Sequence, residues 1–201
     1  HLLDGKVYFE LPVDLINKDM LIGSTVTSIS DNGNAVVGSK PTDLLHVMFT
    51  RNKTHVQLRQ VNTDYITGST QIDEALRKST LGAIISNQKI QAYNNDSTAI
   101  VFDMTGVFLS DNKKMSPFDR NSIYGMYNRT ENYQSDCSYI SQIKAFKDNV
   151  SIKSCLSYTF SVSNSQGASL IKDRPFTAEM TRSIMLLKEK PYRPRMADYR
   201  I

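Results

Sequence analysis

Strict alternation of apolar and polar residues is the feature that most limits what this chain can fold into. In the stretch KVYFEL, Val7, Phe9 and Leu11 occupy alternate positions. A two-residue period places such residues on one face of an extended strand. The stretch therefore predicts a half-buried β-strand, and MLIGSTVTSI at 20–29 predicts a second one.

Two later stretches have the same period on both sides of a turn. In residues 44–61 a turn near Asn52 and Lys53 separates two apolar sets that would face each other: Val47 and Phe49 on one side, Val56 and Leu58 on the other. Residues 88–104 repeat the pattern around a polar turn at 94–96. Both stretches predict β-hairpins, and hairpins in series predict an antiparallel sheet.

Two other stretches have a helical period. Residues 69–85 place Ile72, Ala75 and Leu76 on one stripe, with Thr70 and Asp73 at capping spacing. Residues 139–146 contain a second stripe of Tyr139, Ile140, Ile143 and Phe146. We therefore expect about two α-helices beside the sheet.

The predicted fold class is α+β: a mostly antiparallel sheet built from hairpins, about two helices and an extended C-terminal arm. Residues 150–163 and 175–190 predict two further strands, and the polar residues 109–136 predict a partly mobile excursion. The chain divides into a β-rich unit at 1–65, an α+β unit at 66–187 and the arm at 188–201.

Length and charge narrow the classes of partner. The chain has 201 residues, 40% of them hydrophobic, and a net charge of +4 that gathers mostly in the arm. This share of apolar residues suits a packed core, while the low charge does not indicate a nucleic-acid surface. No apolar run reaches the roughly eighteen residues of a membrane span, and the first residues lack the regions of a signal peptide. We expect no nucleic-acid partner and no transmembrane segment; an export signal could have been removed.

Motifs for catalysis and for metal binding are missing from the sequence. It has no Gly-x-Ser-x-Gly, no phosphate-binding glycine loop and no His-Glu-x-x-His. His46 and His55 could lie near each other across a hairpin, but no carboxylate is fixed beside them by spacing, and we interpret them as surface imidazoles. We therefore predict no catalytic, cofactor-binding or metal-ligating residue in this chain.

The cysteines and the tyrosines each leave two interpretations open. Cys137 and Cys155 could form a disulfide in an oxidising compartment or remain ordinary thiols in the cytosol. A group of tyrosines surrounds the polar excursion and either fixes it to the sheet, which we favour, or forms a binding surface. Its members are Tyr124, Tyr127, Tyr133 and Tyr139.

The last residues, LLKEKPYRPRMADYRI, predict a connector. Pro191 and Pro194 exclude a continuous helix and favour extended backbone. Basic residues keep the arm solvated, while apolar and aromatic residues give it contact area. The residues we expect to dock on a neighbouring domain are Tyr192, Arg195, Met196 and Tyr199.

The order of several segments resembles a bacterial family. The segments are GKVYFELPVDLINKDMLIGSTVTSIS, VQLRQVNTDY, STAIVFDMTGVFLSD, SYISQIKAFKDNVSIKSCLSYTF and the closing SIMLLKEKPYRPRMADYRI. Together they are similar to the N-terminal half of the large, exported zinc-dependent metalloproteases of Gram-negative bacteria. In that family two adjoining domains of unknown function precede the catalytic domain. The resemblance covers nearly the whole chain, but none of these segments is a catalytic motif.

The resemblance implies a metzincin-like protease domain beyond Ile201, with zinc held there by an extended His-Glu-x-x-His motif. No position of this chain matches that motif, so this region would be a non-catalytic accessory or pro-region whose partner is its own protease domain. The parent would be a peptide hydrolase that is exported and periplasmic or cell-surface associated. Asp198 is a candidate latch on the zinc, since a carboxylate can displace a zinc-bound water. The alternative is a stand-alone cell-surface module that binds a peptide or a glycan.

Overall fold

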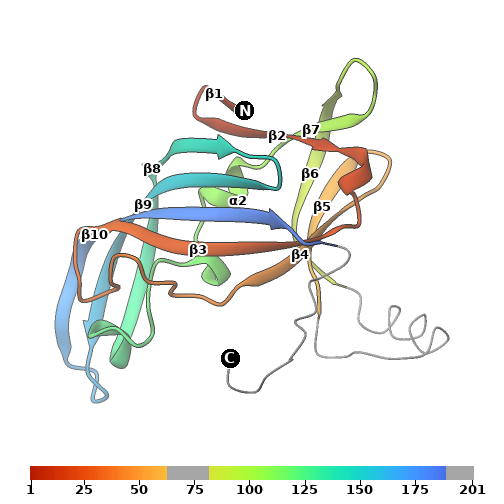
Figure 1. The fold of residues 1–201 in the computed structure, drawn as a ribbon. Helices are drawn as coiled ribbons and strands as arrows, with labels where there is room; N and C mark the ends of the chain where they lie inside the picture. Colours follow the sequence, from red (N-terminus) through yellow and green to blue (C-terminus); the bar gives the residue numbers. More distant parts are fainter. Residues whose placement is uncertain (63–81, 189–201) are drawn as a thin grey trace, which may run out of the picture.

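A computed structural model describes residues 1–62 and 82–188 and shows an antiparallel sheet of ten strands (Figure 1). The strand order across the sheet is β1-β2-β7-β6-β5-β4-β3-β10-β9-β8. The strands are β1 (Leu2–Leu3), β2 (Lys6–Pro12), β3 (Asp19–Ile29), β4 (Leu45–Arg51), β5 (His55–Gln60), β6 (Ala83–Tyr93), β7 (Ala99–Asp103), β8 (Asn128–Ala145), β9 (Asn149–Ser163) and β10 (Ser169–Leu186).

Both predicted hairpins are confirmed. β4 pairs with β5, with Phe49 opposite Leu58, and the side-chain oxygen of Asn52 accepts hydrogen bonds from the backbone within the turn. β6 pairs with β7 around residues 94–98. The long strand β9 alternates as the sequence predicts, because each even-numbered residue from Ile152 to Val162 is buried.

The predicted α+β class is wrong, since the fold is almost entirely antiparallel β. Among the described residues the helical segments are one four-residue α-helix and three short 3-10 turns: α2 (Thr105–Phe108), η1 (Val13–Leu15), η2 (Lys113–Met115) and η3 (Tyr124–Met126). The first predicted helix falls mainly on 63–81, outside the described residues, and β6 begins at Ala83. No described helix is long and apolar enough to cross a membrane.

The second predicted helix, at 139–146, is a strand. These residues belong to β8 and to the turn after it, and β8 is irregular between Ile140 and Gln142. The irregularity lets Ile140 and Ile143 both pack on the core, although an odd spacing would place them on opposite faces of a regular strand. A bulged strand therefore has the apolar spacing of a helix at this position.

The predicted polar excursion at 109–136 is shorter and more ordered than expected. Residues from Asn128 onward are already in β8. Before them, the chain buries Met115 and Phe118 beneath the sheet. Polar residues dominate the composition, but these two side chains fix the segment to the core.

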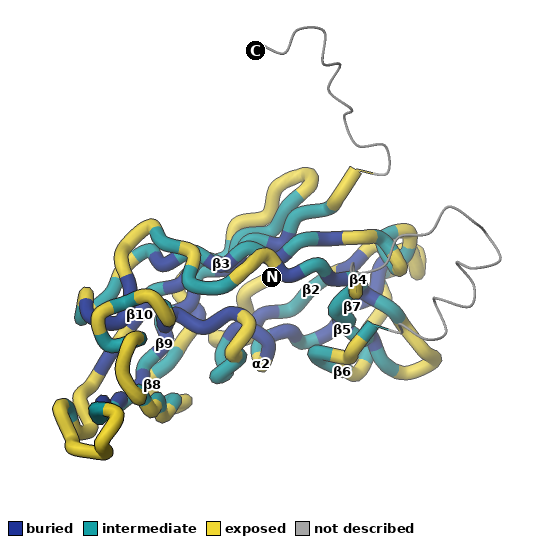
Figure 2. The backbone as a smooth tube through the Cα atoms, turned by 90° about the horizontal axis from the view of Figure 1, so that it is seen from below, coloured by how far each residue is buried: buried dark blue, intermediate teal, exposed yellow. Residues whose placement is uncertain are grey.

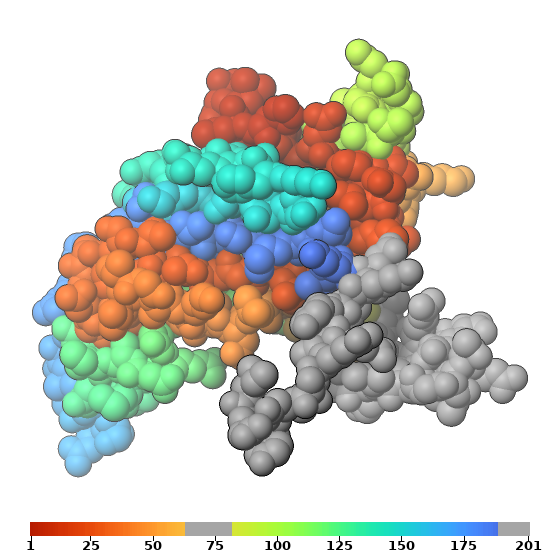
Figure 3. Space-filling view, viewed as in Figure 1, coloured from red at the N-terminus to blue at the C-terminus, as the bar shows by residue number. Residues whose placement is uncertain are grey.

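The sheet curls until its two edges approach each other, which makes it nearly closed and barrel-like. The core cluster contains Val7 of β2 together with Ile140 of β8 and Ile152 of β9, strands from opposite ends of the sheet order. In the space-filling view the N-terminal strands, in red, lie directly over the β8–β9 hairpin, in teal (Figure 3). We call the place where the two edges meet without pairing the seam.

A polar layer divides the interior into two apolar cores. The first core lies under the seam, and the second lies under the loops 31–44 and 109–127. Figure 2 marks the buried positions along the backbone. Three neighbouring strands place a buried polar residue between one core and the other: Ser24 of β3, Arg182 of β10 and Ser154 of β9. The interior therefore has a buried charged residue between its two apolar cores.

The predicted division at residue 65 falls between two paired strands. β5 and β6 lie side by side through pairs such as His55 with Lys89. The core cluster that contains Val7 and Ile152 also joins 1–65 to 66–187. In the described residues these two segments share one sheet and contribute to both apolar cores.

Candidate binding site at the seam

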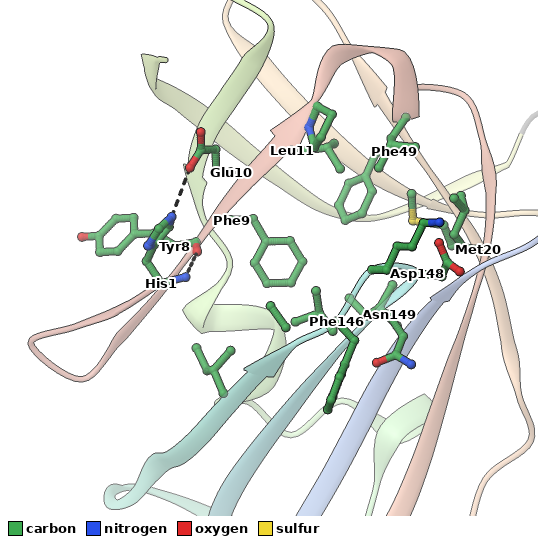
Figure 4. Close-up of a pocket in the computed structure, with 18 residues that line it drawn as sticks. His1, Tyr8, Phe9, Glu10, Leu11, Met20, Phe49, Phe146, Asp148 and Asn149 are labelled. Atoms are coloured by element: carbon green, nitrogen blue, oxygen red, sulfur yellow. Dashed lines mark hydrogen bonds and ion pairs between the residues drawn. The ribbon is translucent and has the colours of Figure 1, made fainter. Parts of the chain in front are cut away.

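A cavity of about 450 Å³ opens at the seam between β2 and the tip of the β8–β9 hairpin (Figure 4). Its floor is apolar and includes Phe9, Phe49, Met20 and Leu186. The Phe9 ring lies 6.3 Å from that of Phe49 and 6.2 Å from that of Phe108. An aromatic cluster of the core therefore reaches the surface here, where it can contact a ligand.

The rim of the cavity is polar and includes both basic and acidic side chains. His1 Nε2 lies 3.1 Å from Glu10 Oε2, and the backbone nitrogen of His1 donates to the carbonyl oxygen of Tyr8 at 2.8 Å (Figure 4). Lys147 and Asp148 line the opposite side. An apolar floor with a polar rim is typical of sites that bind organic ligands or peptide side chains.

Phe146 is the exposed apolar side chain of this rim. It lies in the turn between β8 and β9 and is 60% exposed. The turn is fixed by a hydrogen bond from the Phe146 amide to the carbonyl of Asn149 at 2.8 Å. Because the ring borders the cavity while remaining open to solvent, it offers contact area to whatever occupies the seam.

The two strands at the seam have an unpaired edge among the described residues. β2 pairs with β7 along Tyr8–Pro12. On its other side β1 pairs with Lys6 and Val7, and the backbone of His1 pairs with Tyr8, so in the described residues this edge is open beyond Tyr8. β8 pairs with β9 on one side and with no described strand on the other. Free edges offer backbone groups that an extended polypeptide can bind.

A second feature lies beneath the site, at the polar layer. Arg182 is 2% exposed and donates hydrogen bonds to the carbonyls of Phe108 and Met115 and to the hydroxyl of Ser154. Burial lowers the pKa of Arg182 to about 10. Burial also raises the pKa of the Tyr158 phenol above its ordinary range, and the Asp111 carboxylate adds to this shift. These groups are enclosed by the fold, and we interpret them as structural.

Comparison with known proteins identifies the family. A family model described as "Domain of unknown function (DUF5117)" matches residues 38–201. The chain belongs to the DUF5117 family. No curated protein and no solved structure matches it.

The histidines of the DUF5117 chain do not form a metal site with each other. His46 is near the start of β4 and His55 at the start of β5, so the hairpin places them at opposite ends. His46 Nε2 instead lies 3.0 Å from Asp19 Oδ1. In residues 1–62 and 82–188, no three His, Cys, Asp or Glu side chains are grouped as metal ligands.

The two cysteines lie on neighbouring strands and are both free thiols in the structure. Cys137 is exposed in the irregular part of β8, and its carbonyl accepts a hydrogen bond from Ser157 Oγ at 3.0 Å. Cys155 is half-buried in β9, opposite Tyr139, and its proximity raises the pKa of the Tyr139 phenol. The disulfide between them stays a prediction.

The four tyrosines divide into two pairs. The Tyr124 ring lies 5.5 Å from that of Phe160, and the Tyr133 ring lies 5.4 Å from that of Tyr158, so both fix their segments to the core. Tyr127 and Tyr139 are exposed. The interpretation that the tyrosines anchor the chain therefore holds for two of the four.

The residues predicted to dock on a neighbouring domain, and the latch candidate Asp198, lie outside the described residues. The docking residues are Tyr192, Arg195, Met196 and Tyr199. The seam cavity itself was missed by sequence reasoning. One signal was available, because AFKDN places the apolar Phe146 within a turn, where a polar residue is usual.

Proposed function

We propose that this DUF5117 chain is a non-catalytic accessory region of an exported zinc-dependent metalloprotease, and that it holds an extended segment of that protease in the seam. The segmental resemblance of the sequence supports the parentage and the exported location. The zinc and the catalytic groups would belong to the protease domain.

The seam is the observation that carries the proposal. Its cavity of about 450 Å³ lies within the range of about 300–1,000 Å³ found for ligand pockets. An extended segment could pair with the edge of β2 beyond Tyr8 and insert one or two apolar side chains toward Phe9 and Phe49. Binding of this kind would favour one arrangement of the protease, and so assist its folding, its latency or the positioning of its substrate.

Site-specific photo-crosslinking in the full-length protein tests the proposal. A benzophenone amino acid replaces Phe146 at the rim and, as a matched control, replaces Tyr93, an exposed aromatic residue of the β6–β7 hairpin that does not line the cavity. We expect crosslinks from position 146 to one segment of the protease domain, and few from position 93.

Two results would contradict the proposal. Crosslinks from position 146 to foreign peptides alone would favour a stand-alone peptide-binding module. Equal crosslinking from positions 146 and 93 would show that the seam has no preferred occupant. The protease activity of Phe146→Asp is a second measurement. A charge at the rim should weaken binding of the segment, and so change the activity, while the buried core stays intact.

A further inference from the structure

A second concave surface lies away from the seam, between the loop that contains Lys40–Leu45 and the segment 113–121. This groove has a volume of about 880 Å³. Half of its described lining residues are charged, with five basic side chains against three acidic ones: Lys40, Lys113, Lys114, Arg120 and Arg129 against Asp43, Asp119 and Glu131. The excess of positive charge favours a ligand that carries anionic groups.

Arg129 is the fixed member of the basic set. Its side chain is 6% exposed, and its Nε donates to Glu131 Oε1 at 2.9 Å. The guanidinium lies 4.7 Å from the centre of the Phe118 ring, and Nη1 donates to Ser122 Oγ at 3.2 Å. Held from several sides, this cation costs little further ordering when a ligand binds nearby.

The other basic residues differ in how far they are already paired. Lys113 Nζ lies 2.9 Å from Asp111 and 3.1 Å from Glu131, and Lys114 donates to Gln60. Lys40 and Arg120, by contrast, form no ion pair or hydrogen bond through their side chains with the described residues. These two cations are therefore available to an anion.

Neutral polar groups of the groove indicate which other chemical groups its ligand should carry. The lining includes the hydroxyls of Thr42 and Ser116 and the amides of Gln60 and Asn121. The hydroxyl oxygen of Thr42 is buried and has no hydrogen-bond partner in the described structure. Hydroxyl and amide groups can each donate and accept, which suits the many hydroxyls of a sugar.

Among the described residues that line the groove, the one aromatic ring is not free to stack. Phe118 is 5% exposed, and Arg129 lies over its face. Single-stranded nucleic acids need such rings as platforms for their bases. The groove thus lacks the feature that would favour a nucleic acid, while its cations and hydroxyls remain.

We propose that this groove binds an acidic oligosaccharide, with Lys40 and Arg120 pairing with its carboxylate or sulfate groups and the neutral side chains contacting its hydroxyls. The site is separate from the seam and does not depend on the accessory function proposed for it. It would let the protein attach to an acidic polysaccharide through one surface while the seam stays available.

Titration calorimetry with the whole protein tests the site. The probes are a carboxylate-only oligogalacturonide, a sulfated heparin-derived oligosaccharide and a neutral maltooligosaccharide of similar length. We expect one or both acidic probes to bind and the neutral one not to bind, and the comparison between the acidic probes distinguishes carboxylate from sulfate. The double variant Lys40→Gln, Arg120→Gln should weaken binding by about tenfold or more, because two charge-assisted contacts are lost.

A matched double variant, Arg51→Gln with Lys144→Gln, removes the same charges from exposed positions that do not line the groove. Binding by this control should stay within about twofold of wild type, because distant exposed charges are screened by salt. Circular dichroism checks that both doubles are folded. Phe146→Asp should leave saccharide binding unchanged, which separates this site from the seam.

Three outcomes would overturn the assignment. The first is that neither acidic probe binds the wild-type protein. The second is equal weakening in both double variants, which would indicate attraction by net charge alone. The third is an oligoglutamate peptide that binds as tightly as the sugars and with the same dependence on Lys40 and Arg120, which would make the groove an acidic-peptide site.

Discussion

Arg182 of β10 donates a hydrogen bond to the carbonyl oxygen of Met115 at 3.1 Å, in the middle of the protein. The same guanidinium binds the carbonyl of Phe108. It thereby ties the segment that crosses between the two cores to the long strands of the sheet. No carboxylate accepts a hydrogen bond from it in the described structure, so backbone and hydroxyl dipoles alone stabilise this charge.

Replacing Arg182 by leucine tests this role. Three buried acceptors lose their donor, which lowers the free energy of unfolding by about 1–3 kcal/mol each. Removal of the buried charge raises it by roughly 3 kcal/mol. We expect the free energy of unfolding to fall by a net of up to about 6 kcal/mol. Denaturant unfolding measures it.

The control for this substitution is Arg174→Leu. Arg174 is about half exposed and pairs with Asp31 at 3.4 Å, and surface pairs contribute about 0–1 kcal/mol. Hydrogen exchange gives a local measurement, since amides at 104–118 should lose protection in Arg182→Leu but not in Arg174→Leu. Unchanged protection in Arg182→Leu would show that Arg182 does not hold this segment against the sheet.

Tyr158 should make the protein less stable in alkali. The folded state raises the pKa of this phenol, so in the unfolded chain the phenol ionises first, above about pH 10. The unfolded state then binds fewer protons than the folded one, and the free energy of unfolding decreases as the pH rises through this range. Arg182, whose pKa is lowered to about 10, acts with the opposite sign in the same range.

The comparison that isolates Tyr158 is Tyr158→Phe against Tyr93→Phe, unfolded by denaturant at about pH 9 and about pH 11. Tyr158→Phe should lose less stability between the two pH values than wild type. Tyr93 is exposed, so its substitution should behave as wild type. Equal losses in all three proteins would refute the assignment.

Gly33 should not tolerate a side chain. A Cβ atom at this position would overlap the ring of Tyr124, which packs on Phe160. Gly33→Ala should therefore displace Tyr124 and lower the free energy of unfolding by about 1–3 kcal/mol, the usual cost of overpacking. Thermal or denaturant unfolding measures the change.

Gly106→Ala is the matched control, because no atom lies within 4 Å of a Cβ placed there. This glycine is in α2, where alanine is favoured by up to about 1 kcal/mol. Equal destabilisation by both substitutions would show that the loss at position 33 is not due to the overlap with Tyr124.

The two thiols should differ in their reaction with a bulky maleimide. Cys137 is exposed, whereas Cys155 is half-buried between β8 and β10, with Tyr139 and Glu179 opposite it. We expect Cys137 in the reduced protein to react about tenfold faster or more, since access of the reagent limits the rate. Mass spectrometry of digested samples gives both rates, and Cys137→Ser and Cys155→Ser assign them; faster labelling of Cys155 would contradict the burial described here.

Sequence reasoning found the regular strands and failed where strands are irregular. β2, β9 and the β4–β5 hairpin keep a two-residue period, so their faces could be assigned from the residues alone. β8 could not, because its irregular pairing makes Ile140 and Ile143 share a face. The spacing of apolar residues along one strand does not reveal a β-bulge, because the bulge depends on the pairing with the neighbouring strand.

The candidate sites depend on contacts that no local pattern contains. The seam exists because the sheet curls until β2 meets the β8–β9 turn, more than 130 residues later in the chain. The groove brings Lys40 next to Arg120 in the same way. The buried Arg182 was also unpredictable, since it occupies an alternate position of β10 with the apolar residues Met180 and Ile184.

The pairing of β3 with β10 also determines when this protein can fold. Ile22 pairs with Ile184 and Ile29 with Ala178, so the central strand β3 gains one of its two neighbours only after the chain has been made as far as Ala178. A ribosome adds about 5–20 residues per second, so β3 waits for many seconds with one edge unpaired. Such non-local pairing slows folding and leaves the nascent chain exposed to aggregation until β10 has been made.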